Sequence, residues 1–345
     1  AALASLTENS GNLCNNWVDR RQPAAVNNPT GEFDLIEQIA ARLGPRRADT
    51  VLGIGDDAAL IATPGRLAVA TDTLNEGVHY PPWIRPADLG WKALAVNLSD
   101  LAALGAEPAW ALLNLTLPAA DPHWLAGFLS GFARLARYYN VDLIGGDTTR
   151  GPSSVTVTVL GRAPARPLTR RGARPGDRVV VSGPLGDAAA AWRLLNAGAT
   201  CPAALSRRLF RPRPRLAVGA ALAGIASAGI DVSDGLLADL GHLLTADRLG
   251  ARLELAALPV SPALAALAWP DTERWTAQCT GGEDYELCLT VAADRLAAAA
   301  AQAAAAGVRL TPIGTITRPP GIVCVTPEGG EWRAPDSGYD HYISS

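Results

Sequence analysis

The stretch VDLIGGDTTRG, residues 141–151, carries a strand-like run directly into a pair of glycines, an aspartate and an arginine. Residues 141–144 predict a short strand. The two glycines admit a close approach of the backbone to a ligand, the Asp147 carboxylate can hold a metal ion, and the Arg150 guanidinium can neutralise a phosphate. The stretch therefore predicts a strand that delivers a polar segment to a charged ligand.

Acidic residues stand among glycines and small residues in five further segments: GIGDDA (53–58), ATDTLNEG (70–77), NLSDLAALG (97–105), DVSDG (231–235) and GGEDYE (281–286). Carboxylates repel phosphate, so the set does not suit a bare anion cradle. Several converging carboxylates suit a hard cation with oxygen ligands. Magnesium shared with nucleotide phosphates satisfies both facts, and the sequence therefore predicts a phosphotransfer enzyme.

Two of these segments have a clear place in the predicted elements. Asp72 follows an apolar strand at 67–71, and the end of a strand is where α/β folds place ligands. Residues 88–104 have a helical pattern, in which Asn97 and Asp100 are neighbours on one face. An aspartate among alanine, valine and leucine is costly to bury unless it is paired or coordinated. Asp100 is therefore favoured as a functional residue.

The remaining segments leave more than one reading open. In DVSDG, Asp231 and Asp234 flank Ser233 at a predicted helix start, where either acid could be an ordinary N-cap instead of a metal ligand. GIGDDA matches the dinucleotide fingerprint superficially, but its two aspartates would lie beside a pyrophosphate and no clear strand precedes it. A Rossmann oxidoreductase therefore has little support. No P-loop and no protein-kinase motif is present, which indicates a phosphotransferase outside both classes.

The chain length and a proline- and glycine-rich boundary predict an α/β protein of two domains. At 345 residues the chain exceeds one typical domain. Residues 1–30 are polar and lack periodicity, which predicts a loose extension. The stretch 162–177 is rich in proline, glycine and arginine and is the best domain boundary. We therefore expect an N-terminal domain over 31–163 and a C-terminal domain over 164–345.

Composition disfavours several classes of partner. The net charge is −3 and no basic block stands out, so no nucleic-acid partner is expected. The five cysteines form no C-x-x-C pair, so neither a zinc site nor a disulfide framework is expected. The first residues lack the features of a signal peptide, and the longest apolar run, 216–230, is too short to cross a bilayer. We expect a cytoplasmic protein without a membrane partner.

The acidic segments and their flanks, taken in order, resemble thiamine-monophosphate kinase. The resemblance covers residues 31–342 and rests on these motifs: GEFDLI (31–36), GIGDDAAL (53–60), TDTLNEGVH (71–79), DLGWKALAVNLSDLAALGAEP (88–108), LIGGDTTRGP (143–152), LTRRGARPGD (168–177), IDVSDGL (230–236), GGEDYEL (281–287) and GYDHY (338–342). It implies a two-domain aminoimidazole ribonucleotide synthetase-like α/β fold, with an N-terminal domain that pairs in a homodimer.

The resemblance also implies a reaction, in which the γ-phosphoryl group of ATP passes directly and in line onto thiamine monophosphate to give thiamine diphosphate, the last step of its biosynthesis. The implied ligands of several Mg²⁺ ions are Asp57, Thr71, Asp72, Asp100, Asp147, Asp231 and Asp234. The implied ATP contacts are Gly146, Asp147, Arg170 and Ser233. The implied contacts of thiamine monophosphate are His79, Glu283 and Tyr339.

Two features qualify these implied roles. A metal-shell position that is often serine in the family is Ala70 here, so a side-chain ligand is lost at that point. The acceptor is a phosphate monoester whose second pKa is about 6, so it is already largely a dianion at neutral pH. It needs charge neutralisation instead of a general base, and no acid–base residue is assigned. We interpret Lys92 as a structural or ion-pairing residue.

Two alternatives stay open. The first is a sibling ATP-dependent synthetase with another acceptor. A selenophosphate synthetase carries a reactive cysteine or selenocysteine near a lysine, whereas Cys14 has no lysine nearby, and the hydrogenase-maturation sibling ends in a cysteine, whereas this chain ends in Ser345. The second alternative is a nucleotide- or thiamine-phosphate-binding protein without turnover. The expected acids are present apart from the Ala70 position, which favours an active enzyme.

Overall fold

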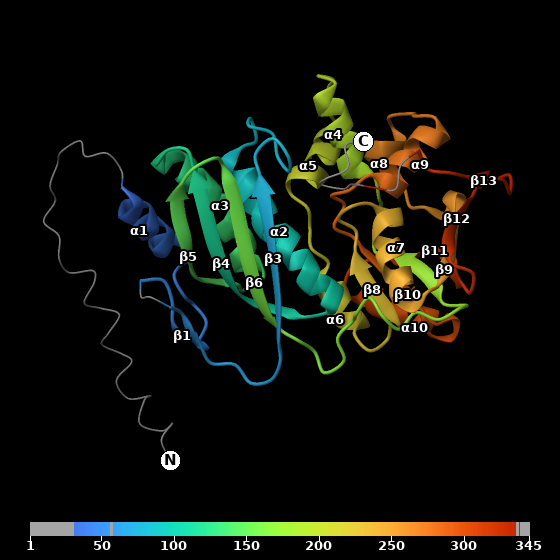
Figure 1. The fold of residues 1–345 in the computed structure, drawn as a ribbon, viewed down its shortest axis with the longest axis horizontal. Helices are drawn as coiled ribbons and strands as arrows, with labels where there is room; N and C mark the ends of the chain where they lie inside the picture. Colours follow the sequence, from blue (N-terminus) through green and yellow to red (C-terminus); the bar gives the residue numbers. More distant parts are fainter. Residues whose placement is uncertain (1–30, 56–57, 336–337, 339–345) are drawn as a thin grey trace, which may run out of the picture.

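The computed structural model describes residues 31–55, 58–335 and 338. Its strands gather into two main sheets with a long helix, α2, between them (Figure 1). None of the helices in the described part of the chain combines the length and the apolar character that a membrane crossing needs.

The first half of the chain holds a four-stranded sheet and its helices. Its elements are α1 (Glu32–Leu43), β1 (Thr50–Leu52), β2 (Leu60–Ile61), β3 (Leu67–Asn75), α2 (Pro86–Leu104), β4 (Glu107–Leu117), α3 (Pro122–Tyr138), β5 (Asp142–Arg150) and β6 (Ser154–Arg162).

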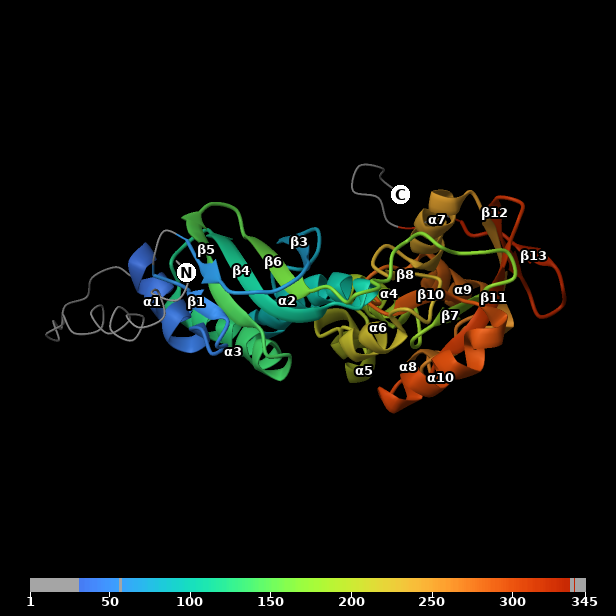
Figure 2. The ribbon, with the colours of Figure 1, turned by 90° about the horizontal axis from the view of Figure 1, so that it is seen from below.

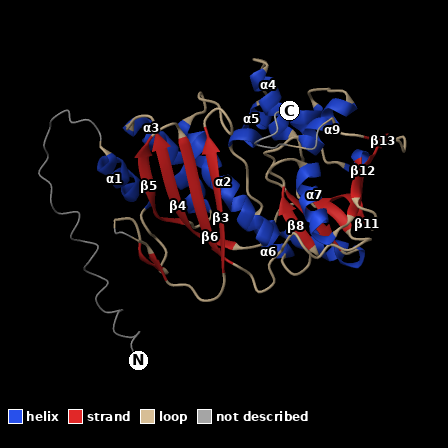
Figure 3. Cartoon of the chain, viewed as in Figure 1, coloured by secondary structure: helices blue, strands red, loops and turns tan. Residues whose placement is uncertain are grey.

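The strand order in this sheet is β3-β6-β4-β5, with β4 and β5 parallel and the other pairs antiparallel. In β6, Val155, Val157 and Val159 are buried while the threonines between them are half-buried, as the period of a strand with one covered face requires. Helices α2 and α3 lie on the covered face, and none of the helices in the described residues lies on the other face (Figures 2 and 3).

The second half of the chain forms a seven-stranded sheet in the order β13-β12-β9-β11-β7-β10-β8. Its elements are β7 (Arg178–Val181), α4 (Asp187–Asn196), α5 (Ala203–Phe210), α6 (Leu216–Leu222), β8 (Ala228–Asp231), α7 (Leu236–Asp247), β9 (Gly250–Glu254), η1 (Leu255–Ala257), α8 (Pro262–Ala265), α9 (Asp271–Thr280), β10 (Leu287–Val291), η2 (Ala293–Arg295), α10 (Leu296–Ala305), β11 (Thr311–Thr317), β12 (Gly321–Val325) and β13 (Glu331–Trp332).

Helix α2 joins the two halves. Pro86 supplies its first turn, and Gly105 ends it with a φ of 70°, a conformation that glycine adopts without cost. Most of its residues are buried, because it packs on α3, on the four-stranded sheet, and on α6 and β8 of the second half. A Cβ on Gly219 of α6 would lie 1.9 Å from the Ala102 carbonyl oxygen, so this crossing requires glycine.

Three predicted boundaries were wrong. β3 does not stop at Thr71 but continues to Asn75, so Asp72 lies within the strand and not at its end. β5 likewise continues through the GGDTTR segment to Arg150, and α7 begins at Leu236 instead of Ser233. In both strands the pairing with a neighbour overrides the low strand preference of glycine and aspartate. The predicted division between residues 163 and 164 stays a prediction.

Candidate active site

Asp72 faces α2 because of its place in β3. Residues of this strand alternate between the face that α2 covers and the open face, and Asp72 lies on the covered side between Ala70 and Leu74. Its backbone N–H donates a 2.8 Å hydrogen bond to Asn97 Oδ1, while Asn97 Nδ2 donates to the Ala93 carbonyl oxygen. The amide side chain of Asn97 therefore fixes β3 against α2.

The second half of the chain reaches the same place through Asp231, the last residue of β8. This carboxylate is buried, and its Oδ2 accepts a 2.6 Å hydrogen bond from Ser99 Oγ on α2. Asp231, Asp72 and Asp100 thus come from one strand of each sheet and from the helix between them. These three carboxylates lie close enough to influence one another's charge, and their assignment to a metal stays a prediction.

The carboxylates of this cluster raise one another's pKa. Burial, with the charges of Asp231 and Asp234, raises the pKa of Asp72 to about 6. Burial, with the charges of Asp231 and Asp72, raises the pKa of Asp100 to about 8, although Arg170 opposes the rise. Burial also raises the pKa of Asp231. The protein alone therefore leaves this cluster short of positive charge.

The DVSDG loop presents Asp234 and Ser233 beside the cluster. Its shape depends on Asp239 in α7, whose Oδ2 accepts hydrogen bonds from the N–H groups of Ser233 (2.9 Å) and Asp234 (3.0 Å). Burial raises the pKa of Asp239 to about 7. The sequence analysis missed Asp239, although it carries the signal that marked Asp100: an acid among leucine and alanine in a helix.

His79 and Glu283 meet through Lys92 of α2. Lys92 Nζ donates a 2.9 Å hydrogen bond to the His79 carbonyl oxygen and forms an ion pair with Glu283 Oε2. His79 Nδ1 accepts a hydrogen bond from the N–H of Asn75, so Nε2 carries the proton of the neutral ring. One buried lysine thus contacts the backbone of His79 and the carboxylate of Glu283, the two predicted acceptor contacts.

The acidic side chains of the GGEDYE loop are directed to two different places. Glu283 is directed to Lys92, whereas Asp284 and Glu286 are buried in the second half. Asp284 Oδ2 accepts a hydrogen bond from the Gly186 N–H, and Glu286 pairs with Arg208 and Arg215 and accepts a hydrogen bond from Ser182 Oγ. Glu283 is therefore the acid of this loop that a substrate could contact.

Thr71 and Asp147 do not join the carboxylate cluster. The register of the sheet places Asp147 of β5 opposite Asn114 of β4, and the same row of residues continues across β6 to Thr73 of β3. The side chain of Thr73 lies on the open face. Thr71 lies on that face too, where its hydroxyl bonds that of Thr158. Both side chains therefore lie across the sheet from Asp72. Within one chain, the sheet therefore separates Thr71 and Asp147 from the other predicted metal ligands.

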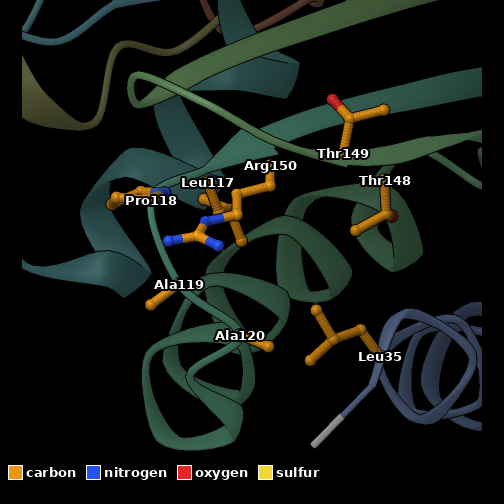
Figure 4. A pocket seen from close by; sticks show the side chains of 8 residues that line it. All are labelled: Leu35, Leu117, Pro118, Ala119, Ala120, Thr148, Thr149 and Arg150. Carbon is orange, nitrogen blue, oxygen red and sulfur yellow. The ribbon is translucent and has the colours of Figure 1, made fainter.

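Gly146 and Arg150 lie on the same edge strand, β5. Gly146 has a φ of 145°, and a Cβ there would lie 1.9 Å from the Leu113 carbonyl oxygen. Arg150 lines a cavity of about 340 Å³ with Thr148 and Thr149 and with Leu35 of α1 (Figure 4). The predicted sites Asp57 and Tyr339 lie outside the described residues.

Carboxylate oxygens suit a hard divalent cation, but their arrangement sets a limit. Among the residues that the structure describes, no group of three or more histidine, cysteine, aspartate or glutamate side chains is arranged to hold a metal ion by itself. Magnesium in enzymes is commonly bound by one or two carboxylates together with substrate phosphates and water. The donor set therefore fits a metal ion that arrives with a nucleotide.

Comparison with known proteins follows the two halves of the chain. Residues 55–163 match the family described as AIR synthase related protein, N-terminal domain, and residues 174–326 match its C-terminal domain. The thiamine-monophosphate kinase of Escherichia coli (strain K12) is 46% identical over 323 residues, covering 91% of this chain and 99% of that protein. This chain belongs to the thiamine-monophosphate kinase family. The predicted fold class is confirmed.

Solved structures agree with this membership. The crystal structure of thiamine-monophosphate kinase from Stenotrophomonas maltophilia K279a superposes with a TM-score of 0.78 at 47% identity, covering 84% of this chain and 95% of that one. A structure described as AaThiL complexed with AMPPCP and TMP has a TM-score of 0.71 at 31% identity, covering 90% of this chain and 97% of that one.

Proposed function

We propose that this protein is a thiamine-monophosphate kinase, which transfers the γ-phosphoryl group of ATP to the phosphate of thiamine monophosphate and releases thiamine diphosphate and ADP. The observation that carries the proposal is the convergence of Asp72, Asp100 and Asp231 from both halves of the chain. The family membership supports it, as does the relative complexed with AMPPCP and TMP. ATP is accordingly the co-substrate.

Magnesium fits the carboxylate cluster. The residues that would hold it are Asp72, Asp100, Asp231 and Asp234, whose oxygens are the ligands that this ion prefers. The raised pKa values of Asp72, Asp100 and Asp231 support this assignment, since a divalent cation stabilises carboxylates whose negative charges repel one another. When bound, the ion neutralises phosphate charge as two polyanions approach each other.

The protein's own groups complete the phosphate end of the site. Arg170 lowers the pKa of Asp100 and of Asp231, so its charge acts at the cluster, and it is exposed enough to meet a nucleotide phosphate. Ser233 adds a hydroxyl on the loop that Asp239 shapes. Because the acceptor phosphate is already ionised, these groups need only position and neutralise the two substrates. No side chain is required as a base.

The acceptor end lies at His79 and Glu283. The His79 ring is held with Nε2 as its donor, which suits an oxygen of the acceptor. The Glu283 carboxylate suits the positively charged thiazolium ring of thiamine. Tyr339 stays a predicted contact outside the described residues.

The remaining predicted ligands suit a homodimer. Thr71, Gly146 and Asp147 belong to the four-stranded sheet, whose open face is covered by no helix of the part of the chain that the structure describes, and Val69 on that face is 59% exposed. A second copy packed on this face would cover Val69 and bring additional groups to Asp147. We therefore keep Gly146 and Asp147 as predicted ATP contacts and propose a homodimer through this face.

A direct assay tests the function. The purified protein is incubated with ATP, Mg²⁺ and thiamine monophosphate, and thiamine diphosphate is measured by its fluorescent oxidation product. Thiamine and aminoimidazole ribonucleotide precursors serve as alternative acceptors. Product formed only from thiamine monophosphate supports the proposal. Product from another acceptor alone would establish a sibling synthetase, and binding of both substrates without product would establish a binding protein.

A further inference from the structure

Lys92 is the only lysine in the chain, and it is 1% exposed. Burying an ammonium group is costly unless it is paired, so its partners identify what the charge does. Those partners are the His79 carbonyl oxygen, at 2.9 Å, and the Glu283 carboxylate. The first belongs to the loop after β3 and the second to the loop before β10, so one ammonium group joins the two halves of the chain.

Both partners are held firmly by their own backbones. The N–H of His79 donates to the Asn75 carbonyl oxygen (2.9 Å), and that of Glu283 donates to the Ser233 carbonyl oxygen (2.7 Å). Glu283 has a φ of 72°, a conformation that is unfavourable for a residue with a side chain. Its loop therefore keeps a strained shape that directs the carboxylate to Lys92.

The same face of α2 contacts the second half at another point. Ser99, about two turns after Lys92, bonds Asp231 in the carboxylate cluster. Lys92 and Asp100 are separated by about 12 Å along the helix axis, at 1.5 Å per residue. Helix α2 thus carries the contact for the phosphate end and the contact for the acceptor end on one rigid element.

We propose that Lys92 is a positioning residue for the acceptor. It holds Glu283 Oε2, and through it the GGEDYE loop, at a set distance from His79, so that both acceptor contacts face one substrate across the two halves of the chain. This inference rests on the proposed function, because it takes His79 and Glu283 as acceptor contacts. In this arrangement, Lys92 itself contacts no reacting atom.

The test compares Lys92→Met with the wild type in steady-state kinetics. Methionine fills a similar volume without the charge. We expect KM for thiamine monophosphate to rise about tenfold or more, while KM for ATP changes by less than about twofold. In a double-mutant cycle, Lys92→Met should add little further loss to Glu283→Gln, because the lysine acts through that carboxylate.

A matched control is Arg211→Gln. Arg211 pairs with the buried Asp88, which lies about one turn before Lys92 on α2, so this variant removes a partner of a different buried charge on the same helix. The Arg211→Gln substitution should lower the melting temperature and leave KM for thiamine monophosphate unchanged. A Lys92→Met protein that behaves like this control, or in which both KM values rise equally, overturns the inference.

Two further results keep the test decisive. If Lys92→Met fails to fold by circular dichroism, Lys92→Arg replaces it: a guanidinium keeps the charge but is larger and planar, so it changes the distance at which Glu283 is held. An acceptor KM raised in Lys92→Arg supports the inference, and an unchanged one overturns it. Wild-type protein that forms no thiamine diphosphate contradicts the proposed function, whereas active wild type with an unaffected Lys92→Met contradicts the inference alone.

Discussion

Ser99 Oγ donates a 2.6 Å hydrogen bond to Asp231 Oδ2, and this bond ties the helix between the two sheets to the carboxylate at the end of β8. Ser99 is fully buried, and its hydrogen bond lowers the pKa of Asp231 against the burial that raises it. The bond therefore favours the ionised form of a carboxylate that we propose as a metal ligand, and it joins the second half of the chain to α2.

Replacing Ser99 with alanine should leave a buried carboxylate without its side-chain donor. We expect the free energy of unfolding to fall by about 1–3 kcal/mol, the cost of an unmade buried hydrogen bond. Urea denaturation in EDTA measures it. Ser130→Ala, which removes an exposed serine's bond to the Gly127 carbonyl oxygen, should cost less than about 0.5 kcal/mol. Equal losses of unfolding free energy in the two variants would contradict a specific stabilising role for the Ser99 hydrogen bond.

Asp100→Asn should reduce turnover about 100-fold or more, since it removes a charge from the proposed magnesium ligands, which supply several kcal/mol of charge stabilisation. Initial rates at saturating substrates measure the loss. Asp121→Asn is the matched control: Asp121 caps α3 through the His123 N–H, and asparagine caps equally well. Activity of Asp100→Asn that equals the control would exclude Asp100 from the metal site.

The stability of the metal-free protein should fall as the pH rises. The folded-state pKa values of Asp72 and Asp100, about 6 and about 8, lie above their ordinary value of 3.8. The folded protein therefore binds protons that the unfolded chain has lost, and stability present at pH 4 is lost progressively as the pH passes through 6 and 8. Melting temperatures in EDTA from pH 5 to pH 9 measure this loss.

A variant isolates the groups responsible. Asp72→Asn/Asp100→Asn has no such protons to lose, so its melting temperature should decrease less between pH 5 and pH 9. Excess Mg²⁺ should also reduce the decrease in the wild type, because the ion replaces those protons. A wild-type pH profile that matches the double variant would show that these two carboxylates do not titrate as a buried pair.

Val69→Arg should convert the proposed homodimer to a monomer. Val69 is on the open face of β3, and an arginine there would bury an unpaired charge between two copies. Sedimentation velocity gives the mass. Val323→Arg, on β12 of the other sheet, changes an exposed valine outside that face and should leave the dimer intact. A wild-type monomer at micromolar concentration would contradict the proposal directly.

Part of the carboxylate cluster could be predicted from the sequence, because some of its acids carry a local signal. Asp100 was favoured as an acid on an apolar helix, and the structure places it with Asp72 and Asp231. The same pattern surrounds Asp239, which the sequence analysis did not consider because it follows the DVSDG motif instead of standing in it. Asp239 was therefore omitted because it lies outside the motif, although the sequence around it carries the same signal.

Other features depended on tertiary contacts that a sequence does not state. The alternation in Thr71-Asp72-Thr73 puts neighbouring side chains on opposite faces once β3 pairs with β6 along its full length, and this divides the predicted metal ligands. The ion pair of Lys92 with Glu283 joins residues far apart in the chain. Its partner depends on how the second half packs on α2, so the sequence indicated a structural or ion-pairing role for Lys92 but not which residue it contacts.

Transfer of labelled phosphate tests the central claim most directly. Protein with Mg²⁺, thiamine monophosphate and ATP labelled in its γ-phosphate should place the label in the terminal phosphate of thiamine diphosphate, in equal amount to the ADP formed. Asp72→Asn should abolish the transfer. Label that appears as inorganic phosphate, or wild-type levels of transfer by Asp72→Asn, would contradict a kinase built on this cluster of carboxylates.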